Sequence, residues 1–561
     1  MMKALSNPRA SLAAGIALLA VAGAGAVSQT APPSAPPGRD RTATLLAIND
    51  VYRIEGLENG TLGGLARFRA LRLELERESP DLLVLHGGDF LFPSFASRMY
   101  RGEQMIAVMN ILDGDARAFD PRMFVTFGNH EFERPRLKDA PLLDERIESS
   151  QFRWLGGNVT FVRGADGAPL IASPNLSRTA IVLSGGLRVG LFGITIQSTG
   201  VEYIQDFAGE QAAARTLTSE LRAQGAEVVV ALTHLNASND RRLLEVLGDA
   251  GPDILIGGHD HEAMSQKVNG RWLLKADADA RTATVVRLTK KADGSVVVIP
   301  ELRRLQGDAP SPDPNVKKVV DDWQARHAHA FCAEAQAGPG CLDETYGHTR
   351  TELAADENKI RGRETSLGDW VTDRMLGAFK ECGAQVAFLN SGSLRINRDL
   401  PAGTPITRRH VEELFAYKTP LYLLRLDGAT MTKVADQSVR GWPGSGSWLQ
   451  IAGFGFRHEM ANRAAKDVSW LGAAGSRAMA PADSVLAVVG DYLVNPELGD
   501  QDGYQMLNRA QIVGTCPQNG VDLKAVVMDA LRAAEPLGIG PEVEGRICQG
   551  APGAPCLVHS R

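Results

Sequence analysis

Five short apolar segments, each typical of a buried strand, end in a polar residue of a kind that binds metal ions. The segments are residues 45–48, 82–85, 123–127, 228–232 and 254–256, and the polar residues after them are Asp50, Asp89, Asn129, His234, His259 and His261. One such segment would mean little, because Gly-Asn and similar dipeptides are ordinary turns. Five in one chain restrict the fold more than any other feature, because they predict that several strand ends meet.

Helical patterns lie between several of these segments. Apolar residues recur at helical spacing over residues 64–78, 211–224 and 239–247, and Asn239 or Asp240 is placed to cap the third helix. Strands that alternate with helices predict an α/β fold with helices on the faces of the sheet. Ligands of such sheets bind outside the carboxyl ends of the strands, where the polar residues fall.

The length of 561 residues predicts at least two domains. We place the first domain at residues 42–305 and a turn-rich interdomain linker at 306–345. A second apolar pattern over residues 346–535 predicts the second domain, with strands at 386–389, 421–426 and 484–489 and helices at 365–380 and 523–534. The Gly/Pro-rich tail, residues 536–561, is expected to wrap the surface.

The first residues resemble an export signal. Lys3 and Arg9 precede a small-residue apolar stretch, and Ala24-Gly25-Ala26 fits a cleavage site, so we predict a signal peptide over residues 1–26. A retained membrane anchor is the alternative, but the stretch is short and rich in Ala and Gly. Residues 27–41 form a Pro-rich linker. No later run is long enough to span a bilayer, so we predict a periplasmic or secreted protein with no membrane span after signal cleavage.

The cysteine content and the net charge give further information about the class of protein. The chain has six cysteines, and an even number in an exported protein permits disulfides whose pairing the sequence does not give. Cys332 and Cys341 flank a Gly/Pro turn and form the favoured pair, while Cys548 and Cys556 flank a second such stretch. The net charge of -6 provides no basic surface for a nucleic-acid polymer.

The chemistry of the polar strand ends points to metal ions. Asp, Asn and His without a thiolate suit Zn, Mn or Fe. One carboxylate with ligands on both sides suits two metals about 3.5–4 Å apart. The excess positive charge of such a pair would attract phosphate. Any one residue is explained as well by a turn or a helix cap, and it is the set that favours a metal site.

These residues resemble the motifs of a known family. Gly88-Asp89, Gly128-Asn129-His130-Glu131, Thr233-His234 and Gly258-His259-Asp260-His261 are similar to the calcineurin-like metallophosphoesterase motifs, in the order of the periplasmic 5′-nucleotidase family. The resemblance implies an α/β fold with an N-terminal four-layer α/β/β/α metallophosphoesterase sandwich, followed by a second, α+β nucleotide-binding domain. It also implies two divalent metal ions.

The resemblance assigns a role to each residue of the first domain. Asp89 would bridge the metals, Asp50 and His261 would bind one, and Asn129, His234 and His259 would bind the other. His130 would stand beside the phosphate and stabilise it or protonate the leaving group. Glu133 takes the place of the Asp that usually orients this histidine.

One departure from the family concerns the first metal. The usual Asp-x-His motif reads Asp50-Val51-Tyr52 here, so a tyrosine replaces a ligand histidine. Tyr52 either binds the metal as a phenolate, which would shift the preference towards Fe or Mn, or packs at the rim while water completes the shell.

The second domain resembles the substrate-holding domain of the family. Asn390-Ser391-Gly392-Ser393-Leu394-Arg395 is similar to its Asn-Gly-Gly-Gly-Ile-Arg loop, and Arg361 precedes a similar Glu-Thr segment. Guanidinium forks pair well with phosphate. Two rings would stack on the base. The implied substrate-binding residues are Arg361, Asn390, Arg395, Trp448, Tyr492 and Asp502.

The function that follows is metal-dependent hydrolysis of nucleotide phosphate esters outside the cytoplasm, by in-line attack of a metal-bound hydroxide. A 2′,3′-cyclic-nucleotide phosphodiesterase or a nucleotide-sugar hydrolase would share the same metal chemistry, and a related sulfur-compound hydrolase is a further alternative. A non-catalytic nucleotide-binding protein on the same scaffold is the alternative of another class. The expected partner is a nucleotide or another small phosphate ester, and the oligomeric state stays open.

Overall fold

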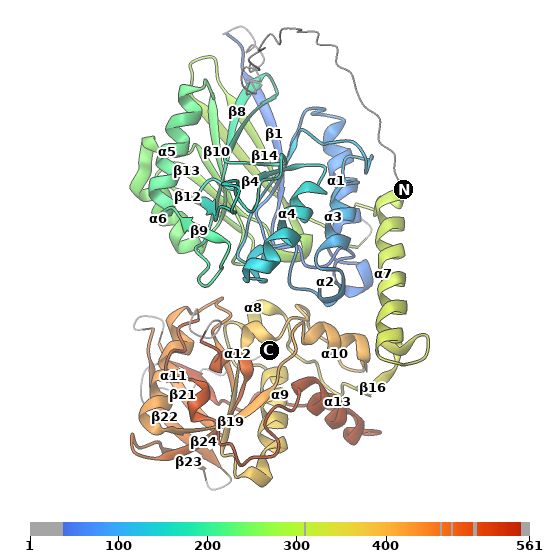
Figure 1. Cartoon of the computed structure of the whole chain (residues 1–561), viewed down its shortest axis with the longest axis vertical. Helices are drawn as coiled ribbons and strands as arrows, with labels where there is room; N and C mark the ends of the chain where they lie inside the picture. Colours follow the sequence, from blue (N-terminus) through green and yellow to red (C-terminus); the bar gives the residue numbers. More distant parts are fainter. Residues whose placement is uncertain (1–37, 308–309, 460–462, 473–474, 497–501, 551–561) are drawn as a thin grey trace, which may run out of the picture. The chain divides into compact units, whose positions relative to one another are not determined.

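The computed structural model describes residues 38–550 except 308–309, 460–462, 473–474 and 497–501 (Figure 1). The predicted signal peptide, most of the Pro-rich linker and Cys556 lie outside the described residues. None of the helices described is both long enough and apolar enough to cross a membrane.

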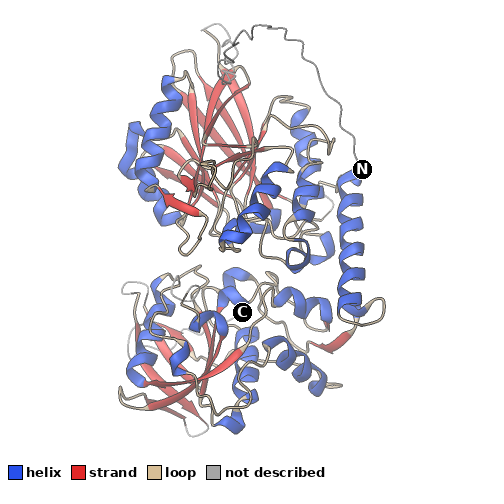
Figure 2. Cartoon of the chain, viewed as in Figure 1, coloured by secondary structure: helices blue, strands red, loops and turns tan. Residues whose placement is uncertain are grey.

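Two mixed sheets form the centre of the first domain (Figure 2). The seven-stranded sheet has the order β15 (Val296–Arg304), β14 (Thr282–Lys290), β1 (Arg41–Ile48), β2 (Leu83–His86), β3 (Met123–Thr126), β4 (Arg153–Leu155) and β6 (Leu176–Ser177). The six-stranded sheet has the order β12 (Met264–Val268), β13 (Arg271–Lys275), β11 (Ile254–Gly257), β10 (Val228–His234), β8 (Leu187–Thr195) and β7 (Thr179–Ser184). A small two-stranded sheet pairs β5 (Val159–Phe161) with β9 (Ile204–Phe207).

Three separate cores show that the domain has four layers. Leu45 and Ala47 of β1 point into a core shared by the two sheets, whereas Leu46 and Ile48 point to the opposite face. This alternation follows from the period of two along a strand. The outer faces are covered by α1 (Leu65–Glu76), α3 (Glu103–Met109) and α4 (Ala140–Glu148) on one side and by α5 (Glu210–Ala223) and α6 (Ala237–Leu247) on the other (Figure 1). The predicted four-layer sandwich is confirmed.

The direction of the strands explains why their ends meet. β1, β2 and β3 are parallel neighbours in one sheet, and β10 and β11 are parallel neighbours in the other. Parallel neighbours end at the same edge of a sheet, so their carboxyl ends gather there. The polar residues that follow these five strands therefore lie close together.

The second domain is α+β, as the sequence predicts. One sheet has the order β19 (Leu421–Asp427), β24 (Ser484–Gly490), β17 (Val386–Asn390) and β20 (Leu449–Ala452), and the other β23 (Gly475–Ala478), β22 (Ala465–Gly472), β21 (Phe454–His458) and β25 (Ile547–Gln549). β16 (Thr345–His348) pairs with β18 (Pro405–Thr407). Helices α9 (Ser366–Ala378), α10 (Arg408–Leu414) and α13 (Leu523–Ala534) contribute to one core, and α11 (Gly428–Arg440) to another. The short helices are α2 (Phe95–Tyr100), α8 (Glu357–Ile360) and α12 (Asp491–Val494).

The structure corrects two expectations about local structure. Asp240 does not cap α6: it lies inside the helix, fully buried, and bonds to Thr233 and Lys275. The C-terminal tail is more than a surface wrap, because β25 pairs with β21, and Arg546, which precedes β25, is buried.

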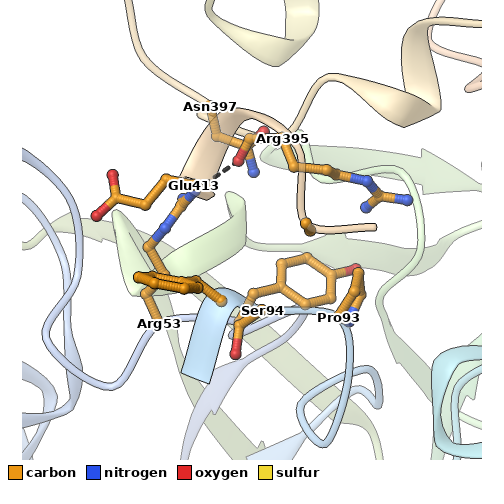
Figure 3. Close-up of a pocket in the computed structure, with 9 residues that line it drawn as sticks. Arg53, Pro93, Ser94, Arg395, Asn397 and Glu413 are labelled. Carbon is orange, nitrogen blue, oxygen red and sulfur yellow. Dashed lines mark hydrogen bonds between the residues drawn. The ribbon is translucent and has the colours of Figure 1, made fainter. Parts of the chain in front are cut away.

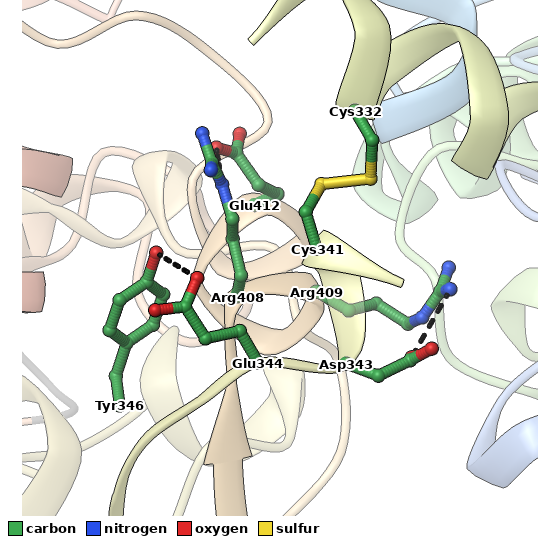
Figure 4. Close-up of a disulfide and its surroundings, with 8 residues drawn as sticks. All are labelled: Cys332, Cys341, Asp343, Glu344, Tyr346, Arg408, Arg409 and Glu412. Atoms are coloured by element: carbon green, nitrogen blue, oxygen red, sulfur yellow. Dashed lines mark hydrogen bonds and ion pairs between the residues drawn. A yellow bond between two sulfur atoms is a disulfide. The ribbon is translucent and has the colours of Figure 1, made fainter. Parts of the chain in front are cut away.

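The predicted linker contains a long helix, α7 (Pro314–Glu334), whose Val316, Val320 and Trp323 belong to the core of the first domain. A disulfide joins Cys332 near its end to Cys341 (Figure 4). A second disulfide, Cys382–Cys516, joins residues 134 apart in sequence and cross-links two segments of the second domain. The Cys332–Cys341 pair is the one that the sequence favours.

Candidate functional site

The strand ends converge on two overlapping groups of possible metal ligands. Asp50, Asp89 and His261 form the first group, and Asp89, His234 and His259 form the second. Within each group the ligand atoms all lie within 4.8 Å of one another. Asp89 belongs to both groups, so its carboxylate is placed to bridge two ions.

Four of these residues have an unusual backbone conformation. The φ angles of Asp50, Asp89, His259 and His261 are 53°, 59°, 84° and 62°. For residues other than glycine this left-handed region costs roughly 1 kcal/mol or more each, and such strain concentrates at functional sites. The strand-end residues hold these angles because neighbouring groups fix them.

Glu131 provides much of that support. Its two carboxylate oxygens accept the backbone N–H groups of Gly128, Asp89, Phe90 and Leu91 at 2.6–3.0 Å. The carboxylate thus ties the turn after β2 to the turn after β3. Gly128 is required by space, because a side-chain carbon there would come within 2.0 Å of Asp89 Oδ1.

Tyr52 points into the first group. Its hydroxyl oxygen lies 2.8 Å from His261 Nε2, 3.3 Å from Asp89 Oδ2 and 3.4 Å from Asp50 Oδ1. Tyr52 is 5% exposed, and Asp279 accepts its backbone N–H at 2.9 Å. The ring is therefore held with its hydroxyl among the candidate ligands, and it does not pack at the rim.

The second group includes Asn129 as well. His234 Nε2 lies 3.1 Å from Asp89 Oδ2 and 3.3 Å from His259 Nδ1. His259 Nδ1 lies 3.0 Å from Asn129 Oδ1. The other nitrogen of His234, Nδ1, lies 2.7 Å from the carbonyl of Gly87, which fixes the ring so that Nε2 faces the group.

The spacing and chemistry of these atoms fit metal ions. Ligands about 2.1 Å from one ion lie roughly 3.0–3.4 Å apart in octahedral or tetrahedral shells. Distances of 2.8–3.4 Å between neighbouring donors in both groups agree with that geometry. Carboxylate, imidazole and amide donors without sulfur are ligands of divalent metal ions.

The pKa shifts of the buried carboxylates and histidines show that the carboxylates attract positive charge. Burial opposes ionisation of Asp50, but the charge and hydrogen bond of His261 outweigh it and lower its pKa to about 2. Burial likewise opposes protonation of His261, but Glu357 and Asp50 raise its pKa to about 9. Asp89 raises the pKa of His234 to about 10 against the effect of burial. Positive charge therefore gathers at His261 and His234 beside the carboxylates, whereas burial and the charge of His234 lower the pKa of His259 to about 3.

His130 lies beside the shared carboxylate. Its backbone N–H donates to Asp89 Oδ1 at 2.8 Å, and its Nε2 lies 3.8 Å from Asp89 Oδ2. Its Nδ1 bonds to Glu133 Oε1. A carboxylate only accepts hydrogen bonds, so Nδ1 donates and Nε2 faces the site. The predicted pairing of His130 with Glu133 is present in the structure.

A buried lysine joins the loops that carry the histidines. Lys275 Nζ donates to the carbonyls of Leu235 and Gly258 at 2.6 and 2.7 Å. It also pairs with Asp240 at 2.7 Å and Asp260 at 2.5 Å. Because Leu235 follows His234 and Gly258 precedes His259, one ammonium group holds both ligand loops.

Two predicted arginines of the second domain connect to the metal-ligand groups. The guanidinium of Arg395 lies 6.0 Å from the ring of Tyr52, and no acceptor among the described residues lies within hydrogen-bond distance of its Nη1. Arg361 pairs with Glu357, whose other oxygen lies 2.6 Å from His261 Nδ1. Arg395 thus contacts the strand ends through Tyr52, and Arg361 is connected to them through Glu357.

A small cavity lies next to Tyr52 (Figure 3). Arg53 donates there to the carbonyl of Arg395, and Asp279 pairs with Arg53. Residues of both domains line the cavity: Tyr52, Arg53, Pro93, Ser94, Phe95, Arg395, Asn397, Glu413 and Ala416.

The other predicted substrate residues divide into two sets. Asn390 ends β17 and accepts from Ser393 at 2.7 Å. Asp502 accepts from Tyr492, and burial raises the pKa of Asp502 although Tyr492 and the two arginines oppose this shift. Trp448, in contrast, is 0% exposed and packs in a core. The expectation that Trp448 stacks on a base is therefore wrong, because no face of its ring is accessible.

Sequence reasoning missed three residues that act on the site. Glu131 was visible inside the Gly-Asn-His-Glu motif, where an acid beside two polar residues signals a loop-organising group. Glu357 and Tyr417 carried no signal, because they belong to the second domain and contact the first only in three dimensions.

Comparison with known proteins agrees with this geometry. The calcineurin-like phosphoesterase model matches residues 43–263, and the 5′-nucleotidase C-terminal domain model matches residues 345–509. The first domain is thus a calcineurin-like phosphoesterase domain. Because both models match in this order, the chain belongs to the 5′-nucleotidase family of two-domain metallophosphoesterases and is a phosphoric-ester hydrolase.

Individual relatives are distant. The 5′-nucleotidase of Bos taurus is 22% identical over 91% of this chain and 92% of its own. The chain spans a third of the trifunctional nucleotide phosphoesterase YfkN of Bacillus subtilis, at 23% identity over 84% of this chain and 33% of the relative. The crystal structure of a 5′-nucleotidase precursor from Thermus thermophilus covers 91% of this chain and 99% of its own, with a TM-score of 0.74 and 23% identity.

Proposed function

We propose that the protein hydrolyses the phosphate ester of nucleotides outside the cytoplasm. The observation that carries the proposal is the pair of ligand groups that share Asp89, with His130 on one side and the guanidinium of Arg395 on another. The names of the 5′-nucleotidase relatives support a nucleotide as the substrate.

We assign the ligands as follows. Asp50, Asp89 and His261 would hold one ion, and Asp89, Asn129, His234 and His259 would hold the other. Tyr52 completes the first set, because its hydroxyl lies 2.8–3.4 Å from the three other donors. When bound, two divalent cations would neutralise phosphoryl oxygens and lower the pKa of a coordinated water. Zn, Mn and Fe suit this donor set, and a phenolate ligand favours Mn or Fe.

The side chains of this protein perform the remaining steps. Glu133 accepts a hydrogen bond from the Nδ1–H group of His130. The other ring nitrogen, Nε2, can therefore hold or donate a proton on the side of the ligand groups. We assign His130 the role of protonating the leaving ribose oxygen. Arg361 and Arg395 would pair with phosphate, Asn390 and Asp502 with polar groups of the nucleotide, and Tyr492 with the base.

The disulfides and the predicted signal peptide support a proposal for the cellular location. Two disulfides among the described residues favour an oxidising compartment, and the predicted signal peptide at residues 1–26 provides the route. We propose a periplasmic or secreted protein, with the domain boundaries given by the sequence analysis.

Phosphate release from a panel of substrates tests the proposal. The panel contains nucleoside monophosphates, 2′,3′-cyclic nucleotides and nucleotide sugars, and metal-stripped protein is reloaded separately with Zn, Mn, Mg or Co. We expect turnover of nucleoside monophosphates that falls at least about 100-fold in His130→Ala, the usual minimum for loss of an acid catalyst. Turnover of cyclic nucleotides or nucleotide sugars alone would reassign the substrate. No release from any substrate by folded, metal-loaded protein would favour a nucleotide-binding protein.

A further inference from the structure

A tyrosine of the second domain reaches the acid–base pair of the first. Tyr417 lies between α10 and β19, and its hydroxyl donates to Glu133 Oε1 at 2.6 Å. Glu133 follows His130 by three residues in the first domain. Two residues 284 positions apart in sequence therefore meet at the group that orients His130.

One carboxylate oxygen receives both bonds. Glu133 Oε1 accepts from His130 Nδ1 and from the hydroxyl of Tyr417. A glutamate has one more rotatable bond than an aspartate, so its carboxylate needs more restraint to hold an imidazole in one orientation. The hydroxyl of Tyr417 supplies such a restraint, because a second donor fixes the position of the accepting oxygen.

The surroundings of Tyr417 keep its hydroxyl a donor. Burial raises the pKa of Tyr417 well above its ordinary value, and the negative charge of Glu133 adds to this effect. Arg395 acts in the opposite direction. The phenol thus stays protonated near neutral pH and can donate to Glu133.

We propose that Tyr417 is a positioning residue for the hydrolysis proposed above. Its hydroxyl fixes Glu133 and, through Glu133, the tautomer and orientation of His130. The second domain thereby contributes to protonation of the leaving group in addition to holding the substrate. This inference rests on the proposed function, because it assigns His130 the role of acid.

Two substrates with different leaving groups test this role. A nucleoside monophosphate expels an alkoxide that needs a proton, whereas p-nitrophenyl phosphate expels a stabilised phenolate that needs little help. We expect Tyr417→Phe to lower kcat for the nucleotide roughly 10- to 100-fold, the usual effect of removing a supporting hydrogen bond. For p-nitrophenyl phosphate kcat should change less than about threefold, and KM for the nucleotide less than about twofold.

Control variants separate this role from others. Tyr422→Phe, in β19 of the same domain, removes a similar hydroxyl away from Glu133 and should leave both rates unchanged. In a Glu133→Gln background, Tyr417→Phe should add less than about a twofold loss, because both residues act through one path. Equal losses on both substrates, a raised KM with unchanged kcat, or full additivity with Glu133→Gln would each overturn the proposal.

A measurement without turnover distinguishes failure of this inference from failure of the proposed function. If wild-type protein hydrolyses no nucleotide, the proposed function fails, and the contact is then tested by ¹⁵N NMR of histidine-labelled full-length protein. The His130 resonances, assigned with His130→Ala, should show a proton on Nδ1 in wild type and should shift or broaden in Tyr417→Phe. Identical His130 resonances in the two proteins would overturn the role of Tyr417.

Discussion

Replacement of Lys275 by methionine should destabilise the first domain strongly. Lys275 is 1% exposed, and its ammonium group meets Asp240 at 2.7 Å and two backbone carbonyls at 2.6 and 2.7 Å. Methionine keeps the length of the side chain but leaves Asp240, which is 0% exposed, without its cation. Removing one partner of a buried ion pair costs about 3–5 kcal/mol. We expect the free energy of unfolding of metal-free protein, measured in urea, to fall by that amount.

A second substitution identifies the origin of the loss. The pKa of Asp240 is already raised to about 6 by burial, although Lys275 lowers it, so loss of Lys275 leaves a poorly solvated carboxylate. In Lys275→Met/Asp240→Asn the buried unpaired charge is gone and only the partly exposed Asp260 has lost its cation, so the cost should fall to roughly 1–2 kcal/mol from lost hydrogen bonds. Lys317→Met removes an exposed pair with Asp321 and should change stability little. A loss below about 1 kcal/mol in Lys275→Met, or a double variant no more stable than the single one, would refute this reasoning.

Three further predictions concern other parts of the chain. Tyr52→Phe should weaken one of two bound metal equivalents at least about 10-fold in chelator competition, and Tyr52→His should restore it; unchanged affinity would show that the ring does not bind metal. Burial and Glu364 raise the pKa of Asp369 to about 9, so folding takes up a proton and stability is lost as pH rises from about 4 towards 9. Asp369→Asn should therefore raise Tm at pH 8 and flatten its pH dependence, and a lower Tm would contradict this account. Replacing Cys382 and Cys516 by alanine should cost about 2–5 kcal/mol in urea, because the disulfide closes a long loop, and an unchanged urea midpoint would show that the bridge adds no stability.

The sequence pattern was sufficient to predict strands that alternate with helices and the positions of the ligand-type residues, and the resemblance to the family added the four layers. An apolar run that stops at a turn is a local signal, and parallel strands bring such turns together without further information. Asp50, Asp89, His234, His259 and His261 were found in this way. Their left-handed backbone and the carboxylate of Glu131 that supports it are consequences of close packing, which no local pattern records.

Contacts between distant segments could not be predicted. Glu357 and Tyr417 reach His261 and Glu133 from the second domain, and the bridge between Cys382 and Cys516 spans 134 residues. Trp448 was assigned to the substrate because an aromatic ring near a similar motif fits a base as well as a core. The structure decides for the core, because the ring of Trp448 packs against Trp442, Phe456 and His458.

The direction of Tyr52 illustrates the same limit. The motif Asp50-Val51-Tyr52 places the tyrosine two residues after a ligand, which is compatible with a side chain in the site or at its rim. The structure favours the site because Asp279 accepts the backbone N–H groups of Tyr52 and Arg53 and so fixes this turn. The restraint comes from a residue 227 positions away.

The number of metal ions bound by wild-type protein and by Asp89→Ala tests the central claim most directly. Metal-stripped protein is titrated with Mn or Zn, and the ions that remain after desalting are counted by elemental analysis. Because Asp89 is shared by both ligand groups, we expect two equivalents in wild type and loss of tight binding at both positions in Asp89→Ala. A single equivalent in wild type, or two equivalents retained by Asp89→Ala, would contradict a pair of ions bridged at the strand ends.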